Sequence, residues 1–187
     1  MKRLFAPLLL LLAACSQNTD APPPEPPPPP PPPPATSAPP PGKLGLDFAT
    51  PAEWTSEAPA NNMRKAQWAV PDKDKTGKSA TCVYFGTMGG SVEANIDRWK
   101  AQFQNVQGNP GVDQFKTGSL DVTVLDIVGE YASDMGSDPL KDARMLAAIV
   151  ETPQGNHVFK FWGPRGTVSD WRDAFVEMLK NAKNKGA

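Results

Sequence analysis

The chain has few of the residues on which most metal and nucleophilic sites depend. It contains two cysteines and one histidine in 187 residues, which excludes a zinc site of the usual cysteine and histidine spacing. Cys82 is the only cysteine after residue 41, so no internal disulfide can stabilise a domain there. The 19 basic and 20 acidic residues nearly balance, and binding to nucleic acid requires a basic surface. We therefore expect no metal, no cofactor and no nucleic-acid partner.

Recognisable catalytic motifs are also missing. Neither of the glycine-rich sequences that cradle nucleotide phosphates occurs in the chain. Residues 89–93 lack the closing glycine of a hydrolase nucleophile elbow and lead into a helix. His157 would have to be the base of a serine hydrolase, yet its place beside a hairpin loop predicts an ordinary surface imidazole. The loop carboxylates Asp134, Asp138 and Asp142 could bind a hard cation, but we interpret them as solvated acids.

The first fourteen residues are typical of a signal peptide. Lys2 and Arg3 precede a leucine-rich run that ends at Leu12, which is too short to cross a bilayer as a helix. The following Leu-Ala-Ala-Cys sequence resembles the lipobox of bacterial lipoproteins, and that resemblance implies cleavage before Cys15 and acylation of its thiol. The alternative is an ordinary secretory signal with Cys15 incidental. Ser16 follows where lipoproteins of the inner membrane often carry aspartate, which favours an outer membrane and a domain facing the periplasm.

Residues 15–41 are predicted to form a tether. Fifteen of the twenty residues from 22 to 41 are proline, and proline lacks the N–H that helices and sheets require. Such a run forms a polyproline II rod that rises about 3.1 Å per residue, so it can hold a domain about 60 Å from the membrane. We interpret it as a stiff spacer. A ligand for a proline-recognising groove is the alternative.

Residues 42–187 are long enough for one domain with a substantial core. Alternating apolar residues predict strands near residues 44–48, 63–70, 80–87, 120–131, 144–151 and 157–162, with a bulge near Leu125. A helix is predicted after Ser91, which we expect to cap it, with an apolar stripe of Val92, Ile96, Trp99 and Phe103. A second helix is predicted after Thr167, which we expect to cap it. Cys82 lies within a strand pattern and is expected to be buried and inert.

This order of elements predicts an α+β fold, with a mainly antiparallel sheet of about five to six strands and two principal helices packed on it. Residues 89–99, together with Met63-Arg64, resemble a group of uncharacterised exported bacterial proteins. The element order resembles the PsbP-like α/β/α sandwich, whose members are mostly accessory or binding proteins. Asn95 and Arg98 lie three apart on one helix face and could neighbour Arg64. These three are the candidate binding residues, and the alternative is that they only tie the helix to the sheet.

The sequence therefore predicts a lipoprotein of the bacterial cell envelope. It would be anchored in the bilayer through acylated Cys15 and act as a non-catalytic accessory or binding module. Its partner would be an envelope protein or a small ligand. The alternative is an envelope hydrolase that uses carboxylates or His157.

Overall fold

The computed structural model describes residues 45–75, 77–132 and 138–185. Cys15, the signal sequence, the proline run and Asp134 therefore lie outside the described residues. The elements follow one another as β1 (Leu46–Asp47), β2 (Thr55–Glu57), β3 (Ala66–Val70), β4 (Ala80–Met88), α1 (Val92–Lys100), β5 (Phe103–Gln104), β6 (Gly111–Thr117), β7 (Leu120–Tyr131), β8 (Leu140–Thr152), β9 (Gly155–Pro164), α2 (Arg165–Asp170), α3 (Arg172–Lys180) and β10 (Lys183–Asn184).

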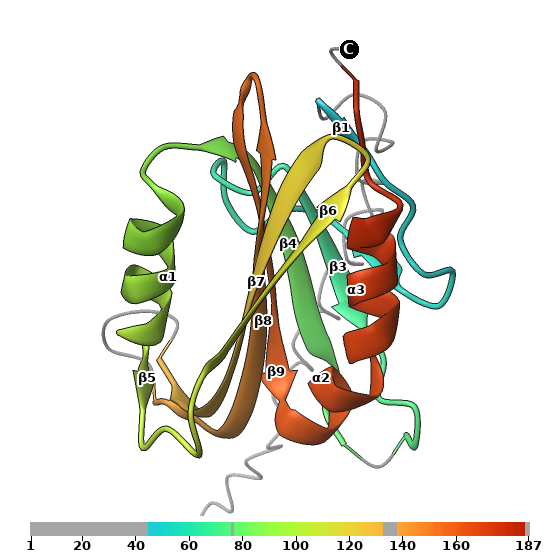
Figure 1. Cartoon of the computed structure of the whole chain (residues 1–187). Helices are drawn as coiled ribbons and strands as arrows, with labels where there is room; N and C mark the ends of the chain where they lie inside the picture. The colour runs from blue at the N-terminus through green and yellow to red at the C-terminus, as the bar shows by residue number, and fades with distance from the viewer. Residues whose placement is uncertain (1–44, 76, 133–137, 186–187) are drawn as a thin grey trace, which may run out of the picture. The chain divides into compact units, whose positions relative to one another are not determined.

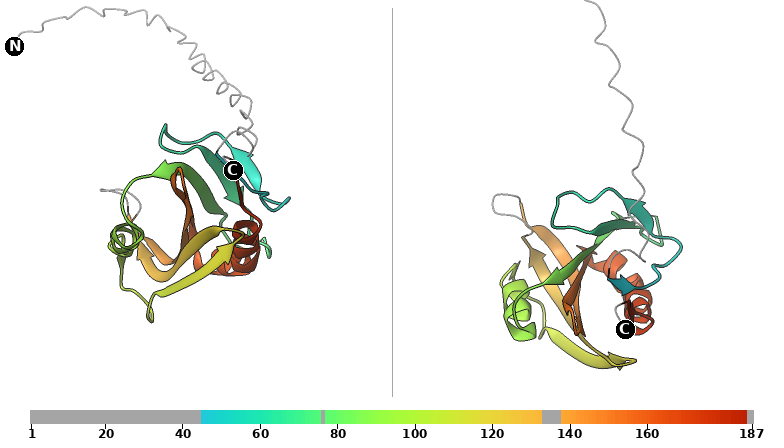
Figure 2. Two further views of the ribbon diagram at one scale, coloured as in Figure 1. Left: turned by 45° about the horizontal axis from the view of Figure 1, so that its top comes forward. Right: turned by 90° about the horizontal axis from the view of Figure 1, so that it is seen from above.

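An eight-stranded sheet separates the helices into two layers (Figure 1). The strand order is β2-β3-β4-β9-β8-β7-β5, with β6 also paired to β7, and every pairing is antiparallel. Helix α1 covers one face, whereas α2 and α3 cover the other, as the view from above also shows (Figure 2). A separate two-stranded ribbon pairs β1 with β10. The α+β class and the antiparallel sheet are confirmed.

The sheet is larger than predicted, and the helices are shorter. Strands β2, β5 and β6 of this sheet were not predicted, and the strand predicted near residues 44–48 lies in the separate ribbon as β1, paired with the unpredicted β10. Strand β6 is a clear case, because six of its seven residues are exposed or half-buried and an edge strand needs no alternating apolar pattern. The predicted final helix is divided at Trp171, whose φ and ψ are −103° and 3°, into α2 and α3. There are thus three helices where the sequence predicted two.

Trp171 and Thr167 both form hydrogen bonds with the segment that joins β3 to β4. Trp171 therefore interrupts the predicted helix, and Thr167 does not cap it. The Trp171 indole donates a 2.7 Å hydrogen bond to the Pro71 carbonyl. The Thr167 hydroxyl donates to the Lys78 carbonyl at 3.0 Å, and no side chain caps α2. The predicted capping role of Thr167 is therefore wrong, because its hydroxyl makes a tertiary contact.

Both faces of the central strands are buried, and each face has its own core. On the α2–α3 face, Phe159 and Phe161 of β9 pack with Tyr84 and Phe175. On the α1 face, Ile96 and Trp99 pack with Ile127 and Ile149. Strand β7 contributes Val122 and Val124 to the first core and Leu125 and Ile127 to the second, so its apolar residues change from even to odd positions. The bulge predicted near Leu125 is therefore wrong. The irregularity in β7 lies between Gly129 and Tyr131.

Candidate functional site

A pocket of about 270 Å³ opens between α1 and the sheet. Its polar lining comes from five elements or their flanking segments and consists of Arg64, Arg98, Gln102, Tyr131 and Lys160. Its apolar lining consists of Met63, Phe85, Met88, Trp99, Val158 and Trp162. None of these eleven residues is acidic. We call this the cationic pocket.

Strand β9 places Lys160 at the base of the cationic pocket. Side chains alternate along a strand, so Val158, Lys160 and Trp162 point to the α1 face while Phe159 and Phe161 enter the opposite core. Lys160 is 7% exposed. Its Nζ donates hydrogen bonds to Gln102 Oε1 at 2.7 Å and to Tyr131 Oη at 3.2 Å. Both partners are neutral, and the described residues place no carboxylate within 4.0 Å of the ammonium group.

Helix α1 holds Arg98 through Asn95. The Ser91 hydroxyl accepts from the Ala94 N–H and caps the helix, as predicted. Asn95 is buried, and its Nδ2 donates to the Ser91 carbonyl at 2.9 Å and to the Gly89 carbonyl at 3.3 Å. Its Oδ1 accepts a 2.6 Å hydrogen bond from Arg98 Nη2. Asn95 is therefore a positioning residue that joins the helix cap to the guanidinium.

Arg64 reaches the pocket from the segment before β3. Its Nη1 donates to Gln67 Oε1 at 2.7 Å, and Gln67 Nε2 in turn donates to Glu57 Oε2 at 2.9 Å. The guanidinium carbon lies 5.6 Å from the centre of the Trp162 ring, within the range of a cation–π contact. Arg64 Nε is buried and has no hydrogen-bond acceptor in the described part of the chain.

The three cations make the pocket strongly electropositive. Burial, followed by the positive charges of Arg98 and Arg64, lowers the pKa of Lys160 from 10.5 to about 8. Within the described residues, no carboxylate oxygen lies within 4.0 Å of the charged groups of Arg64, Arg98 or Lys160. Such uncompensated charge destabilises a fold, and it is therefore a mark of a functional site.

The structure brings two of the three candidate binding residues to one pocket. Arg64 and Arg98 line one pocket although 34 positions separate them, and Asn95 stands behind Arg98 without lining the pocket. Lys160 was missed. Its signal was a lysine in the apolar strand Val158-Phe159-Lys160-Phe161-Trp162, where a charged residue on a covered face has no structural reason to be present.

His157 is not the surface imidazole that the sequence suggested. It is 3% exposed and packs on the α2–α3 face, where its Nδ1 lies 2.5 Å from Tyr84 Oη in a hydrogen bond. Burial lowers the pKa of His157 and raises that of Tyr84. The prediction failed because β8 and β9 extend to a two-residue turn, with Thr152 opposite Gly155, which carries His157 into the sheet.

The other residues that the sequence analysis considered, Cys82 and Asp142, lie outside the cationic pocket. Cys82 is fully buried, and burial raises the pKa of its thiol, as expected for an inert cysteine. Asp142 lies within β8 and its carboxylate is 3.8 Å from Arg165. In the part of the chain that the structure describes, no three His, Cys, Asp or Glu residues are grouped closely enough to hold a metal ion.

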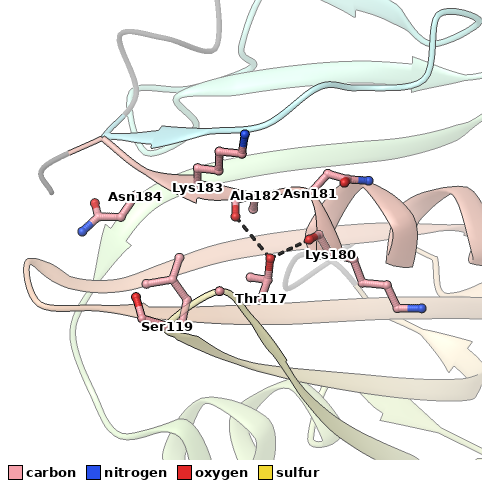
Figure 3. Close-up of a pocket in the computed structure, with 9 residues that line it drawn as sticks. Thr117, Ser119, Lys180, Asn181, Ala182, Lys183 and Asn184 are labelled. Atoms are coloured by element: carbon pink, nitrogen blue, oxygen red, sulfur yellow. Dashed lines mark hydrogen bonds between the residues drawn. The ribbon is translucent and has the colours of Figure 1, made fainter.

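A second pocket, of about 340 Å³, lies where the β6–β7 turn meets the end of α3 (Figure 3). Thr117 Oγ1 points into the chain after α3, lying 2.5 Å from the Lys180 carbonyl and 3.3 Å from the Ala182 carbonyl. Lys180 and Lys183 are exposed there. The buried polar group of this pocket, the Thr117 hydroxyl, therefore joins β6 to the end of α3. The described residues that line this pocket include no buried charged group like Lys160.

Comparisons with known proteins support the fold. No family model and no curated protein matches the chain. The solution structure of cyanobacterial PsbP (CyanoP) from Synechocystis sp. PCC 6803 is similar to it, with a TM-score of 0.50 and 11% sequence identity. The match covers 76% of this chain and 88% of that protein. No helix of the described residues is long and apolar enough to span a membrane. At this identity the likeness concerns the fold alone: the domain has a PsbP-like fold.

Proposed function

We propose that the chain is a lipid-anchored accessory protein of the bacterial envelope whose domain binds a ligand in the cationic pocket. The observation that carries the binding role is the set of Arg64, Arg98 and Lys160 around one cavity, with no carboxylate of the described residues within 4.0 Å of their charged groups. Lys160 is buried, whereas Arg64 is half-buried and Arg98 is exposed, so the cost to folding falls mainly on the ammonium group of Lys160 beside two other cations. A ligand of opposite charge would offset that cost when it binds.

Binding accounts for these residues better than hydrolysis does. A hydrolase needs a nucleophile or an activated water beside a general base, and the described residues that line the pocket include neither a carboxylate nor a histidine. The imidazole of His157 belongs to the opposite core, where Tyr84 occupies its Nδ1. A hydrolase that uses carboxylates or His157 therefore has neither group in this pocket among the described residues.

The anchor and the tether complete the proposal. The lipobox-like sequence before Cys15 supports acylation, and two or more acyl chains give stable membrane attachment. The proline run supports a stiff spacer of about 60 Å between membrane and domain. Together they favour a domain that faces the periplasm from the outer membrane and meets its ligand or partner away from the lipid surface.

Photo-cross-linking in intact cells tests this role. Met63 lines the pocket and is 64% exposed, whereas Val112 on β6 is 44% exposed and lies outside it. We expect a photoreactive residue at position 63, but not at 112, to give a defined adduct identifiable by mass spectrometry. Replacing Cys15 by alanine should release the chain from the membrane fraction and remove that adduct. Equal adducts at both positions, or none at 63, would contradict the proposal.

A further inference from the structure

The cationic pocket combines two kinds of surface. Its polar side presents the guanidinium groups of Arg64 and Arg98 and the ammonium group of Lys160. Arginine binds planar or tetrahedral oxyanions through paired N–H donors, and a lysine adds a compact charge. Arg64 Nε supplies a buried donor that no acceptor in the described chain satisfies. An oxyanion in the pocket would accept from such donors and compensate the charge of all three residues.

The other side of the pocket is apolar. Phe85, Met88 and Val158 line it together, and Phe85 and Met88 are half-buried. Phe85 is there because the register of β4 on β9 shifts between Tyr84 and Gly86, and a bulge of this kind redirects a side chain. A fully hydrated inorganic ion would leave this surface unused, whereas a ligand with an apolar part would bury it.

We propose that the pocket binds a small amphipathic anion, in which a carboxylate or phosphate head is joined to a flat apolar body. The inference rests on the proposed function, because it names the ligand class of the same pocket. The head would lie among Arg64, Arg98 and Lys160, and the body against Phe85, Met88 and Val158. A cavity of about 270 Å³ accommodates a body of one or two rings.

Trp162 and Tyr131 shape the polar side for a flat ligand. Lys160 Nζ lies 5.9 Å from the Trp162 ring centre and 5.4 Å from that of Tyr131, and the Arg64 guanidinium lies near the same tryptophan. The rings hold the cations through cation–π contacts without neutralising them. The charge therefore remains available to an incoming anion.

The proposal predicts that binding depends on pH through Lys160. The charged and titratable lining groups around it are Arg64, Arg98 and Tyr131. Its pKa of about 8 means that the ammonium form is lost as the pH rises through 8, while a bound anion favours that form. Affinity for a carboxylate should fall between pH 7 and pH 9.5. The variant Lys160→Arg keeps its charge over this range and should lose the dependence.

The test is calorimetric titration of the full acylated chain in phosphatidylcholine nanodiscs, with empty nanodiscs as the blank. The probes are benzoate, phenyl phosphate, inorganic phosphate, benzyl alcohol and benzylammonium. We expect benzoate or phenyl phosphate to bind more tightly than inorganic phosphate and benzyl alcohol, and benzylammonium not to bind. The two aromatic anions distinguish a carboxylate from a phosphate head. Equal binding of inorganic and phenyl phosphate, equal binding of benzyl alcohol and benzoate, or no binding of any anion would overturn the proposal.

Variants locate the site. Arg98→Gln and Lys160→Met should each weaken binding of the better anion by about tenfold or more, since each removes a charged donor. Arg165→Gln is the matched control, because it removes one exposed arginine outside the pocket and should leave affinity unchanged. A thermal unfolding midpoint confirms that each variant is folded. Unchanged affinity in folded Arg98→Gln would overturn the assignment. Failure of anion binding with a persistent adduct at position 63 would reject this ligand class but retain the proposed function.

Discussion

The two faces of the sheet differ in the partners that their buried polar and charged side chains have. On the α2–α3 face, Tyr84 is paired with His157 and Trp171 with Pro71, whereas the buried indole N–H of Trp54 has no partner among the described residues. On the α1 face, the cations of the pocket meet only neutral partners among the described residues. One sheet thus supports a core of aromatic and neutral polar side chains on one side and, on the other, a cluster of cations that faces no carboxylate within 4.0 Å among the described residues.

This difference suggests a division of labour between the faces. A core of closely packed aromatic side chains contributes stability. Uncompensated charge has the opposite effect, and proteins retain it where function requires it. The account therefore expects variants of the α2–α3 face to reduce stability, and variants of the cationic pocket to reduce binding while sparing stability or improving it.

The largest effect is expected at Phe175. This α3 side chain is fully buried and packs on Phe161, with ring centres 5.6 Å apart. Phe175→Ala leaves a cavity in the α2–α3 core and should lower the free energy of unfolding by about 3–5 kcal/mol. Chemical denaturation measures the loss. A loss below about 1 kcal/mol would contradict the assignment of the main stabilising core to this face.

A smaller loss is expected from Tyr84→Phe. The variant keeps the ring and its contacts with Phe159 but leaves His157 Nδ1 buried without its tyrosine partner. An unsatisfied buried polar group costs about 1–3 kcal/mol. Anion affinity in the cationic pocket should not change, because the pair belongs to the opposite core. Denaturation and calorimetry on the same sample check both statements, and a coupled loss of affinity would show that the faces are not independent.

Replacing Lys160 should raise the free energy of unfolding instead of lowering it. Lys160→Met removes a buried charge and should raise the free energy of unfolding at pH 7 by about 1–2 kcal/mol. Since the folded pKa is about 8 and the ordinary value is 10.5, the unfolded chain binds more protons between these values, and wild-type stability rises with pH there. The gain should therefore shrink from pH 8 to pH 10. A destabilised variant at pH 7 would mean that Lys160 is a structural residue.

The smallest effect is expected from titration of His157. Burial lowers its pKa in the folded state, so below about pH 6.5 the unfolded chain takes up a proton that the folded chain does not. This contribution to stability is present above pH 6.5 and is lost as the pH falls. Wild-type protein should lose more stability between pH 7.5 and pH 5.5 than His157→Gln does. Equal losses would place the imidazole in contact with solvent.

Elements with a strong local pattern could be predicted from the sequence. The β3–β4 hairpin, the Ser91 cap and the buried positions of α1 follow from alternation, capping and helical spacing. Strand β6 and the break at Trp171 could not be predicted in this way. Their form depends on pairing with β7 and on a hydrogen bond to Pro71, which are contacts between distant segments.

The candidate site was predictable only in its arginines. Arg64, Asn95 and Arg98 drew attention through a sequence resemblance, and the structure brings the two arginines to one pocket. Lys160 belongs to the pocket because β9 lies between β4 and β8 in the sheet and the even-numbered residues 158, 160 and 162 of β9 face α1. Sequence spacing cannot reveal that neighbourhood. For the same reason, His157 looked exposed while the extended β8–β9 hairpin buries it.

The most direct test of the division between the faces is a map of amide chemical shifts during titration with benzoate or phenyl phosphate, whichever binds more tightly. The account predicts perturbations around Arg64, Arg98 and Lys160, with little change at Tyr84, His157 and Phe175. Perturbations centred on the α2–α3 face, or absent around the cationic pocket at saturating anion, would contradict it.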